Sequence, residues 1–250
     1  MRRSHLLILM ISILFLRCAN SISPEEVIGI QFVNEVNSIP ADNNSTIEVR
    51  AYISVNADDD KRTIKFETTA GVFTENNEKE IEVKAEDTLE LNNEKFLSSK
   101  VFLKSSNTVT EEVVLTAEIE LFPARKSISF TEAQPTSIEL SADKFGIFND
   151  FSSEVNLTSV VRSQTGFPSS GSRVSFLVFD DSTGNLFSDV RFRDEKFAIN
   201  ATGESSVVFS AGNLTNQGVP FEGDLRIECR VNGQEDISDS IIINVSSRPD

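Results

Sequence analysis

The chain carries the same series of short alternating segments twice, and this internal repeat limits its possible folds more than any other feature. Residues 45–53 (STIEVRAYI) and 153–161 (SEVNLTSVV) both place apolar side chains at alternate positions. Later matched positions keep nearly the same spacing: Ile47 and Val155 differ by 108, Ile64 and Val174 by 110, Val101 and Val207 by 106, and Val113 and Leu225 by 112. Such a pattern predicts two copies of one β domain that differ in the lengths of their loops.

Alternation with a period of two predicts antiparallel strands with one buried face. Residues 113–121 alternate apolar and polar side chains, and residues 241–245 do the same near the end of the second copy. The stretch 77–103 is rich in Glu, Lys and Leu and could also form a helix. Its own alternation of Ile81 with Val83 and of Leu89 with Leu91 favours strands.

Dense strand signals without helices predict an all-β chain built as two tandem two-sheet sandwiches. Each copy has about 110 residues, which is enough to bury a core of its own. We expect a first sandwich at 28–130, a linker at 131–135 and a second sandwich at 136–247. The linker is short and contains a stiffening proline, so we expect the domains to lie end to end with restricted hinge motion.

The second copy resembles a bacterial immunoglobulin-like (Big) domain of the invasin/intimin type. Residues 173–176 (RVSF) and 184–187 (GNLF) resemble the V-x-F … G-x-L segment of that family, and residues 200–209 resemble its T-x-x-G turn and following strand. The first copy matches more faintly and lacks a counterpart of Gly203; its matching segments are 64–66, 71–73 and 114–117. The resemblance implies immunoglobulin-like sandwiches acting in adhesion or as an interaction scaffold.

The first residues predict an export leader. Arg2 and Arg3 precede an apolar run at 6–16, which is too short to span a bilayer. Residues 14–18 (LFLRC) resemble the lipobox of bacterial lipoproteins, although Arg17 departs from the small residue preferred before the cysteine. That resemblance implies a leader at 1–17, a lipid on Cys18 and a tether at 18–27. The alternative is ordinary cleavage near residues 19–21, which would discard Cys18.

With the lipid, we expect an exported protein held at the bacterial cell envelope, on the outer membrane or the cell surface. The formal net charge is −16, and removal of the leader makes it more negative still. Such a surface repels phosphate backbones and anionic headgroups, which argues against nucleic-acid binding and against membrane contact other than through the lipid. The expected partner is a protein or a host or cell-surface ligand.

The residue types argue against catalysis. The single histidine, His5, lies in the leader, so the mature chain has no histidine base, nucleophile partner or metal ligand. Hydrolysis by carboxylates alone stays open in principle, but the chain has no Trp and one Tyr as sugar platforms. We therefore expect no enzyme. The alternative function is an accessory module of the envelope that binds a glycan or a partner enzyme.

Two acidic runs are the weak candidates for a metal site. Asp58, Asp59 and Asp60 form one, and Asp180 and Asp181 the other. Clustered carboxylates can bind Ca²⁺, yet neither run has the alternating spacing of a calcium loop. We expect solvated turns and no cofactor, with Ca²⁺ as the one cofactor to test.

Phenylalanines in predicted loops of the second copy are the candidates for partner contact. They are Phe148, Phe167 and Phe221. Exposed aromatic side chains often dominate protein interfaces. The alternative is that they close the open ends of a sandwich or seat one domain on the other. Cys229 alternates with apolar residues and corresponds to Ala117 in the first copy, so we expect it to fill the core.

Overall fold

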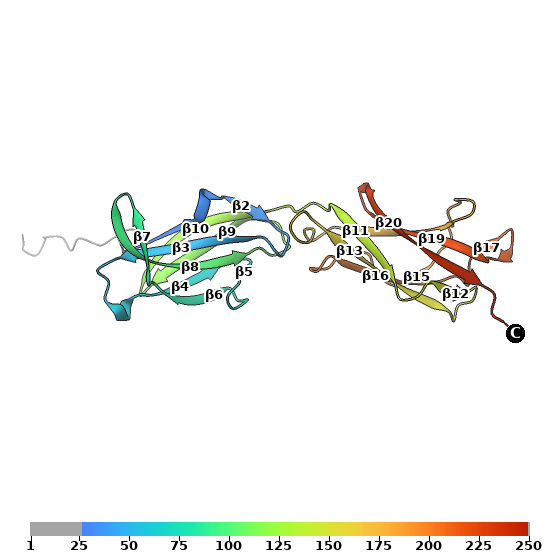
Figure 1. The fold of residues 1–250 in the computed structure, drawn as a ribbon, viewed down its shortest axis with the longest axis horizontal. Helices are drawn as coiled ribbons and strands as arrows, with labels where there is room; N and C mark the ends of the chain where they lie inside the picture. Colours follow the sequence, from blue (N-terminus) through green and yellow to red (C-terminus); the bar gives the residue numbers. More distant parts are fainter. Residues whose placement is uncertain (1–26, 250) are drawn as a thin grey trace, which may run out of the picture.

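The computed structural model of the protein describes residues 27–249, and these are almost entirely β-structure. Two β-sandwiches follow one another along the long axis, with β1–β10 in the first and β11–β20 in the second (Figure 1). The all-β prediction with two tandem sandwiches is therefore confirmed. His5 and Cys18 lie outside the described residues. Between residues 27 and 249, no helix is long and apolar enough to cross a membrane.

The first sandwich pairs two five-stranded sheets. One sheet contains β1 (Ile28–Phe32), β3 (Thr46–Ser54), β8 (Glu94–Lys104) and β5 (Val72–Phe73), with β7 (Asp87–Leu91) also pairing β8. The other runs in the order β2 (Ser38–Pro40), β10 (Phe122–Thr131), β9 (Thr110–Ile119), β4 (Thr63–Thr68) and β6 (Glu80–Lys84). Two 3-10 turns complete it, η1 (Val33–Glu35) and η2 (Asp59–Lys61). The ambiguous stretch 77–103 thus forms strands, as its alternation predicts.

The second sandwich pairs two four-stranded sheets. One runs in the order β11 (Ser137–Ala142), β13 (Glu154–Arg162), β16 (Glu204–Ser210) and β15 (Phe192–Lys196). The other runs in the order β12 (Gly146–Phe148), β20 (Gln234–Ser246), β19 (Gly223–Val231) and β14 (Val174–Asp180). A short hairpin adds β17 (Thr215–Asn216) and β18 (Val219–Pro220). The domain limits 28–130 and 136–247 stay a prediction.

The two sandwiches share the arrangement of their principal strands and differ in the additional ones, which are β5, β6 and β7 in the first sandwich and β15 with the β17–β18 hairpin in the second. Each first strand is divided: β1 and β11 pair antiparallel with β3 and β13, while β2 and β12 pair parallel with β10 and β20. The remaining strands follow the order of the immunoglobulin fold, with the first, second and fifth strands in one sheet and the third, sixth and seventh in the other.

Strand register reproduces the spacing of the sequence repeat. Equivalent residues face equivalent partners: Val49 pairs with Val101 and Leu157 with Val207, while Phe66 pairs with Ala117 and Phe176 with Cys229. These side chains point into two separate cores, one in each sandwich. Cys229 is fully buried, as expected, and burial raises the pKa of its thiol to about 12.

Candidate partner-contact surface

The first acidic run forms an ion-paired turn. Asp59 lies in η2, and its carboxylate contacts Lys84 Nζ at 3.0 Å and Arg62 Nη1 at 3.4 Å. The hydrogen bond from Lys84 is the main cause that lowers the pKa of Asp59. Asp58 and Asp60 flank it at the surface. The carboxylate of Asp59 is therefore engaged by cationic side chains of its own sandwich.

The second acidic run also forms a turn. Asp180 is 6% exposed and accepts hydrogen bonds from Ser182 N at 2.9 Å, Ser182 Oγ at 2.6 Å and Thr183 N at 3.4 Å. The Ser182 hydroxyl is the main cause that lowers the pKa of Asp180. Asp181 lies 3.7 Å from Arg226 Nε. Within residues 27–249, no three His, Cys, Asp or Glu side chains gather in a way that could hold a metal ion.

The three candidate phenylalanines have three different environments. Phe221 is 3% exposed and packs edge-to-face against Phe187, with the ring centroids 5.3 Å apart. It closes the end of the core, so the structure corrects its assignment as a partner-contact residue. Phe148 is half-buried under the Arg248 guanidinium, which lies 5.3 Å from its ring centroid. Phe167 is half-buried at the junction between the sandwiches.

The loop that carries Phe167 seats the second sandwich on the first. We call residues 163–172, which connect β13 to β14, the docking loop. Its backbone donates to the first sandwich or linker three times: Phe167 N to Asp42 O at 2.9 Å, Ser169 N to Ala133 O at 3.1 Å and Ser170 N to Asn107 O at 2.6 Å. The Ser169 hydroxyl also donates to Ala41 O at 2.9 Å. The loop backbone thus makes the junction, while the Phe167 ring lies against Arg162 and Gly203 of its own sandwich, and its assignment as a partner-contact residue stays a prediction.

Asp42 is the buried centre of this junction. Its side chain is 0% exposed, and its carboxylate accepts from Asn44 N at 2.9 Å, Ser45 N at 2.6 Å, Ser45 Oγ at 2.8 Å, Ser105 Oγ at 3.2 Å and the Thr165 hydroxyl. Burial raises its pKa, but these hydrogen bonds outweigh burial and hold the pKa below its ordinary value. Thr165 belongs to the docking loop, so one carboxylate ties the two sandwiches together.

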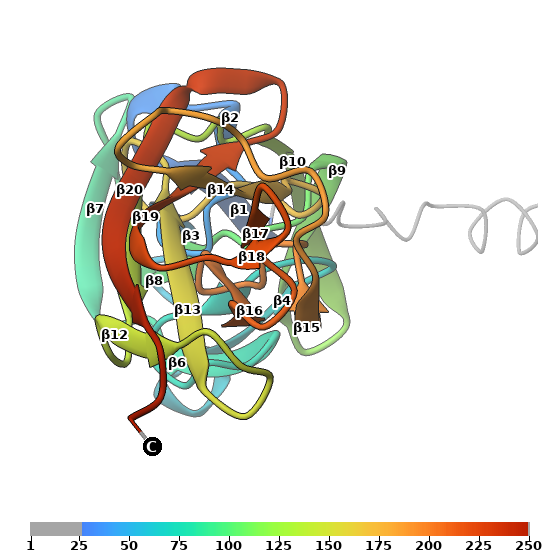
Figure 2. The same ribbon diagram turned by 90° about the vertical axis from the view of Figure 1, so that its right-hand side faces the viewer.

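The opposite end of the second sandwich, which we call the distal end, carries exposed apolar side chains. Phe151 is 69% exposed, Val219 64% and Leu186 53%. They come from three connections at this end, and Figure 2 looks onto it, with the β17–β18 hairpin in front. A cavity of about 570 Å³ lies beside Phe151, lined also by Ser188, Asp189, Val190, Arg191 and Asn213.

Phe151 is held in place although it is exposed. The turn at residues 149–153, which we call the Asp150 turn, is closed by hydrogen bonds from Ser152 N and Ser153 N to Asp150 Oδ1, both 2.8 Å. Backbone and ring atoms of Phe151 lie so close to Gly212 that an added Cβ there would approach them to 2.7–2.8 Å. Phe151 belongs to the loop phenylalanines of the second copy that the sequence offers for partner contact, but nothing local distinguishes it from the others, because the glycine that supports it lies 61 positions further along the chain.

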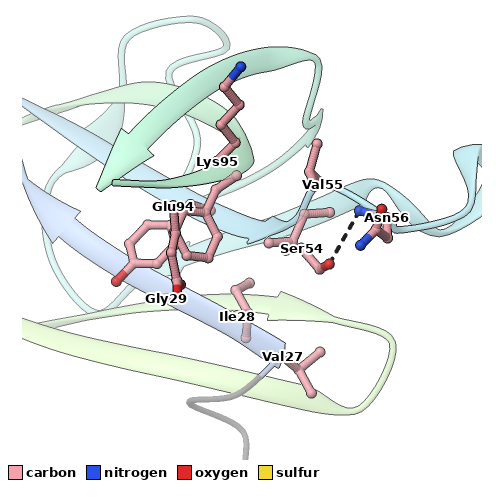
Figure 3. A pocket seen from close by; sticks show the side chains of 11 residues that line it. Val27, Ile28, Gly29, Ser54, Val55, Asn56, Glu94 and Lys95 are labelled. Atoms are coloured by element: carbon pink, nitrogen blue, oxygen red, sulfur yellow. Dashed lines mark hydrogen bonds between the residues drawn. The ribbon is translucent and has the colours of Figure 1, made fainter. Parts of the chain in front are cut away.

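The far end of the first sandwich adjoins the start of the described chain. A cavity of about 370 Å³ opens there beside Val27, and Figure 3 shows its lining, with the Asn56 N–H donating to Ser54 Oγ at 3.2 Å. Tyr52 and Phe96 meet edge-to-face in it at 5.2 Å. The described residues therefore begin at one end of the molecule, and the distal end lies at the other (Figure 1).

These features define a tandem immunoglobulin-like protein. No family model and no curated protein matches the sequence. Solved structures do: the chain is similar to invasin, a bacterial integrin-binding protein, with a TM-score of 0.59 and 16% identity over 90% of this chain and 40% of that one. It therefore spans less than half of that invasin chain. The Yersinia pseudotuberculosis adhesin InvE matches with a TM-score of 0.44 and 11% identity, over 90% of this chain and 60% of that one. The chain has an invasin-type immunoglobulin-like fold.

Proposed function

We propose that the chain is a non-enzymatic lipoprotein of the bacterial cell envelope, acting in adhesion or as an interaction scaffold. One observation carries the proposal: the start of the described chain and the exposed distal end lie at opposite ends of two sandwiches joined by a buried junction (Figure 1). A lipid on Cys18 would place the first sandwich next to the membrane. The tether at 18–27 would then extend at most about 35 Å. The distal end would face away from the membrane.

The proposed partner is a protein or a cell-surface ligand that contacts the distal end. Phe151 is a preorganised aromatic anchor, and such residues supply much of the binding energy of protein interfaces. Invasin is described as integrin-binding. From that description we extend to this chain only the class of interaction, which is the binding of another protein.

The directions of the carboxylate pKa shifts support the proposed absence of catalysis. The carboxylates whose pKa values move are Asp42, Asp59, Asp143, Asp150, Asp180 and Glu228, and all these values move downward. Each of these carboxylates accepts hydrogen bonds from neighbouring groups or forms an ion pair. Both interactions favour its charged form. A hydrolytic carboxylate pair needs one member with a raised pKa to act as general acid. A hydrolytic activity in the purified protein that is lost on mutation of one carboxylate would overturn this part of the proposal.

An attachment assay tests whether the distal end is the contact surface. Cells that display the chain are compared with cells lacking it for attachment to a cultured epithelial layer. Phe151→Ser is expected to reduce attachment at least tenfold, the effect of about 1.4 kcal/mol at a hot spot. Leu121→Ser is the control, because Leu121 is 86% exposed but lies between β9 and β10 at the opposite end. Equal attachment by Phe151→Ser and the unaltered chain would remove the distal end from the proposal.

The alternative function is an accessory module that binds a glycan or an envelope enzyme. The observation in its favour is the edge-to-face Tyr52–Phe96 pair beside the cavity at the far end of the first sandwich, since aromatic rings can pack against sugar faces. Its test is titration of the purified chain with envelope polysaccharides. Binding that Tyr52→Ala abolishes and Phe151→Ser leaves unchanged would favour this function over adhesion.

A further inference from the structure

The Asp42 turn has a second copy in the chain. Asp42 and Asp150 are separated by 108 positions, the same spacing as Ile47 and Val155. Asp42 Oδ1 accepts from the backbone N–H groups two and three residues further on, and Asp150 Oδ1 does the same with Ser152 and Ser153. The two turns therefore occupy equivalent places at the same end of their sandwiches, and both aspartates have lowered pKa values.

Two other residues that accept hydrogen bonds from the docking loop also have counterparts at the distal end. Asn107, whose carbonyl accepts from Ser170 N, corresponds to Asn213 at the spacing of 106 found between Val101 and Val207. The residue two positions after the last strand also has a counterpart. Thr131 pairs with Pro40 as Ser246 pairs with Phe148, so that Ala133 corresponds to Arg248. Three residues that accept hydrogen bonds from the docking loop thus have counterparts at the distal end, and Ala41 is a further acceptor on the receiving surface.

What covers the two surfaces differs. The docking loop covers the first, and the Asp42 side chain is fully buried beneath it. At the distal end the Asp150 side chain is 33% exposed, and Arg248 Nη2 contacts its Oδ2 at 3.0 Å. The same nitrogen donates to Ser152 Oγ at 2.8 Å. Arg248 therefore occupies the place that the Thr165 hydroxyl takes at Asp42.

We propose that the distal end is a docking surface for a further immunoglobulin-like domain that arrives in line, with the loop equivalent to the docking loop foremost. The partner loop would present a hydroxyl to Asp150 Oδ2 and a backbone N–H to Asp150 O, as Thr165 and Phe167 do at Asp42. It would also need glycine at the position of Gly166, where a Cβ would lie 2.6 Å from Asp42 O. This inference rests on the proposed function for the place of partner contact and names the partner class.

The first sandwich of a second copy does not fit this surface. Its equivalent loop, residues 55–62, contains Asp58, Asp59 and Asp60 and no glycine. The missing glycine excludes this loop, because a Cβ at the position of Gly166 would lie 2.6 Å from the receiving carbonyl oxygen. A domain with an uncharged loop of the type Thr-Gly-Phe-Pro-Ser is the matched occupant.

An extended chain tests this docking directly. Residues 1–248 are followed by a second copy of residues 134–250, which keeps the register because Ala133 and Arg248 are equivalent. Hydrogen exchange is followed in the peptide 163–172, which is identical in both copies. Docking of the added copy predicts one slowly exchanging population, because both loops are protected. Arg248→Ala in the extended chain is expected to slow exchange further, since it frees Asp150 for the added loop.

Two results would overturn the inference. One is a split of this peptide into equal slow and fast populations, which means that the added loop stays undocked. The other is a single slow population that persists in Asp150→Ala, because docking would then use another surface. The peptide 223–231 from β19 monitors folding. If half of the population of this peptide exchanges fast, the added copy has not folded. That result also counts against the inference, because the same residues do fold when they follow the equivalent surface of the first sandwich. The adhesion result is independent of all these outcomes.

Discussion

A buried aspartate that forms no ion pair with any residue between 27 and 249 organises the junction. Five donors surround the Asp42 carboxylate, and four of them come from its own sandwich. Burial of a charge is unfavourable unless hydrogen bonds replace the lost water. The fully satisfied carboxylate therefore fixes the positions of the groups around it, the Thr165 hydroxyl among them.

Replacement of Asp42 tests this role. Asp42→Ala leaves the N–H groups of Asn44 and Ser45 without an acceptor, so we expect a loss of about 3 kcal/mol in the free energy of unfolding. Asp42→Asn keeps one oxygen for these N–H groups and should lose about 1 kcal/mol. Urea unfolding of the chain without its leader measures both. Equal stability of Asp42→Ala and the unaltered chain would contradict the assigned role.

The same carboxylate predicts how stability depends on pH. The pKa of Asp42 is lower in the folded protein than its ordinary value of 3.8. Its contribution is therefore complete above the unfolded pKa and is lost as the pH falls below about 4 through the folded pKa. Asp42→Asn cannot titrate, so its stability should fall less steeply than that of the unaltered chain between pH 4 and 2. Parallel curves from urea unfolding at each pH would contradict this.

At the scale of the elements, the turn before β16 is fixed by a glycine. Gly203 has φ of +76°, and an added Cβ would lie 2.3 Å from Val161 O and 2.7 Å from the Phe167 ring. The first sandwich turns differently here, through a β7–β8 hairpin in which Asn92 and Asn93 both have positive φ. Asparagine tolerates this region, which explains why the first copy lacks the glycine of the family pattern.

A matched pair of substitutions separates strain from crowding. Gly203→Ala meets both a positive φ and the Val161 carbonyl, so we expect a loss of about 3 kcal/mol. Gly184→Ala has a similar φ of +73° with nothing within 4 Å, and should lose about 1 kcal/mol. Urea unfolding compares the two variants. If their losses are the same, the close approach to Val161 has no energetic effect.

The elements were predictable from the sequence where their pattern is local. Period-two alternation fixes which side chains of a strand enter the core, and residues 47, 64, 101 and 113 therefore align correctly with the second copy. Loops have no such period. Phe221 and Phe151 look alike in sequence, yet one is buried against Phe187 and the other lies on Gly212. The junction pairs Asp42 with Thr165 across 123 positions, which no local pattern reveals.

At the scale of the whole molecule, the docking loop makes the two sandwiches one body. Gly166 lies against the first sandwich, where an added Cβ would approach Asp42 O to 2.6 Å and the Asn44 Cβ to 2.7 Å. Three backbone donors that follow it in the loop, at positions 167, 169 and 170, cross the junction. A rod built this way holds its distal end at a defined distance from its tether.

A larger side chain in the docking loop should free the two sandwiches to move relative to each other. Gly166→Leu is expected to separate the sandwiches while leaving both cores folded, because its clash lies between them. Small-angle scattering should then show a broader distribution of lengths. Gly146→Leu is the control, because the nearest atom to its added Cβ is 4.0 Å away. Identical scattering from Gly166→Leu and Gly146→Leu would show that the junction does not hold the rod straight.

The central claim is that this rod is tethered to a membrane at the end opposite to its contact surface. The intact mass of the mature N-terminus, purified from native membranes, tests it most directly. The account predicts a chain that begins at Cys18 and carries two or three acyl groups. An unmodified start near Ser21 or Ile22 would contradict it, since the protein would then be exported without an anchor of its own.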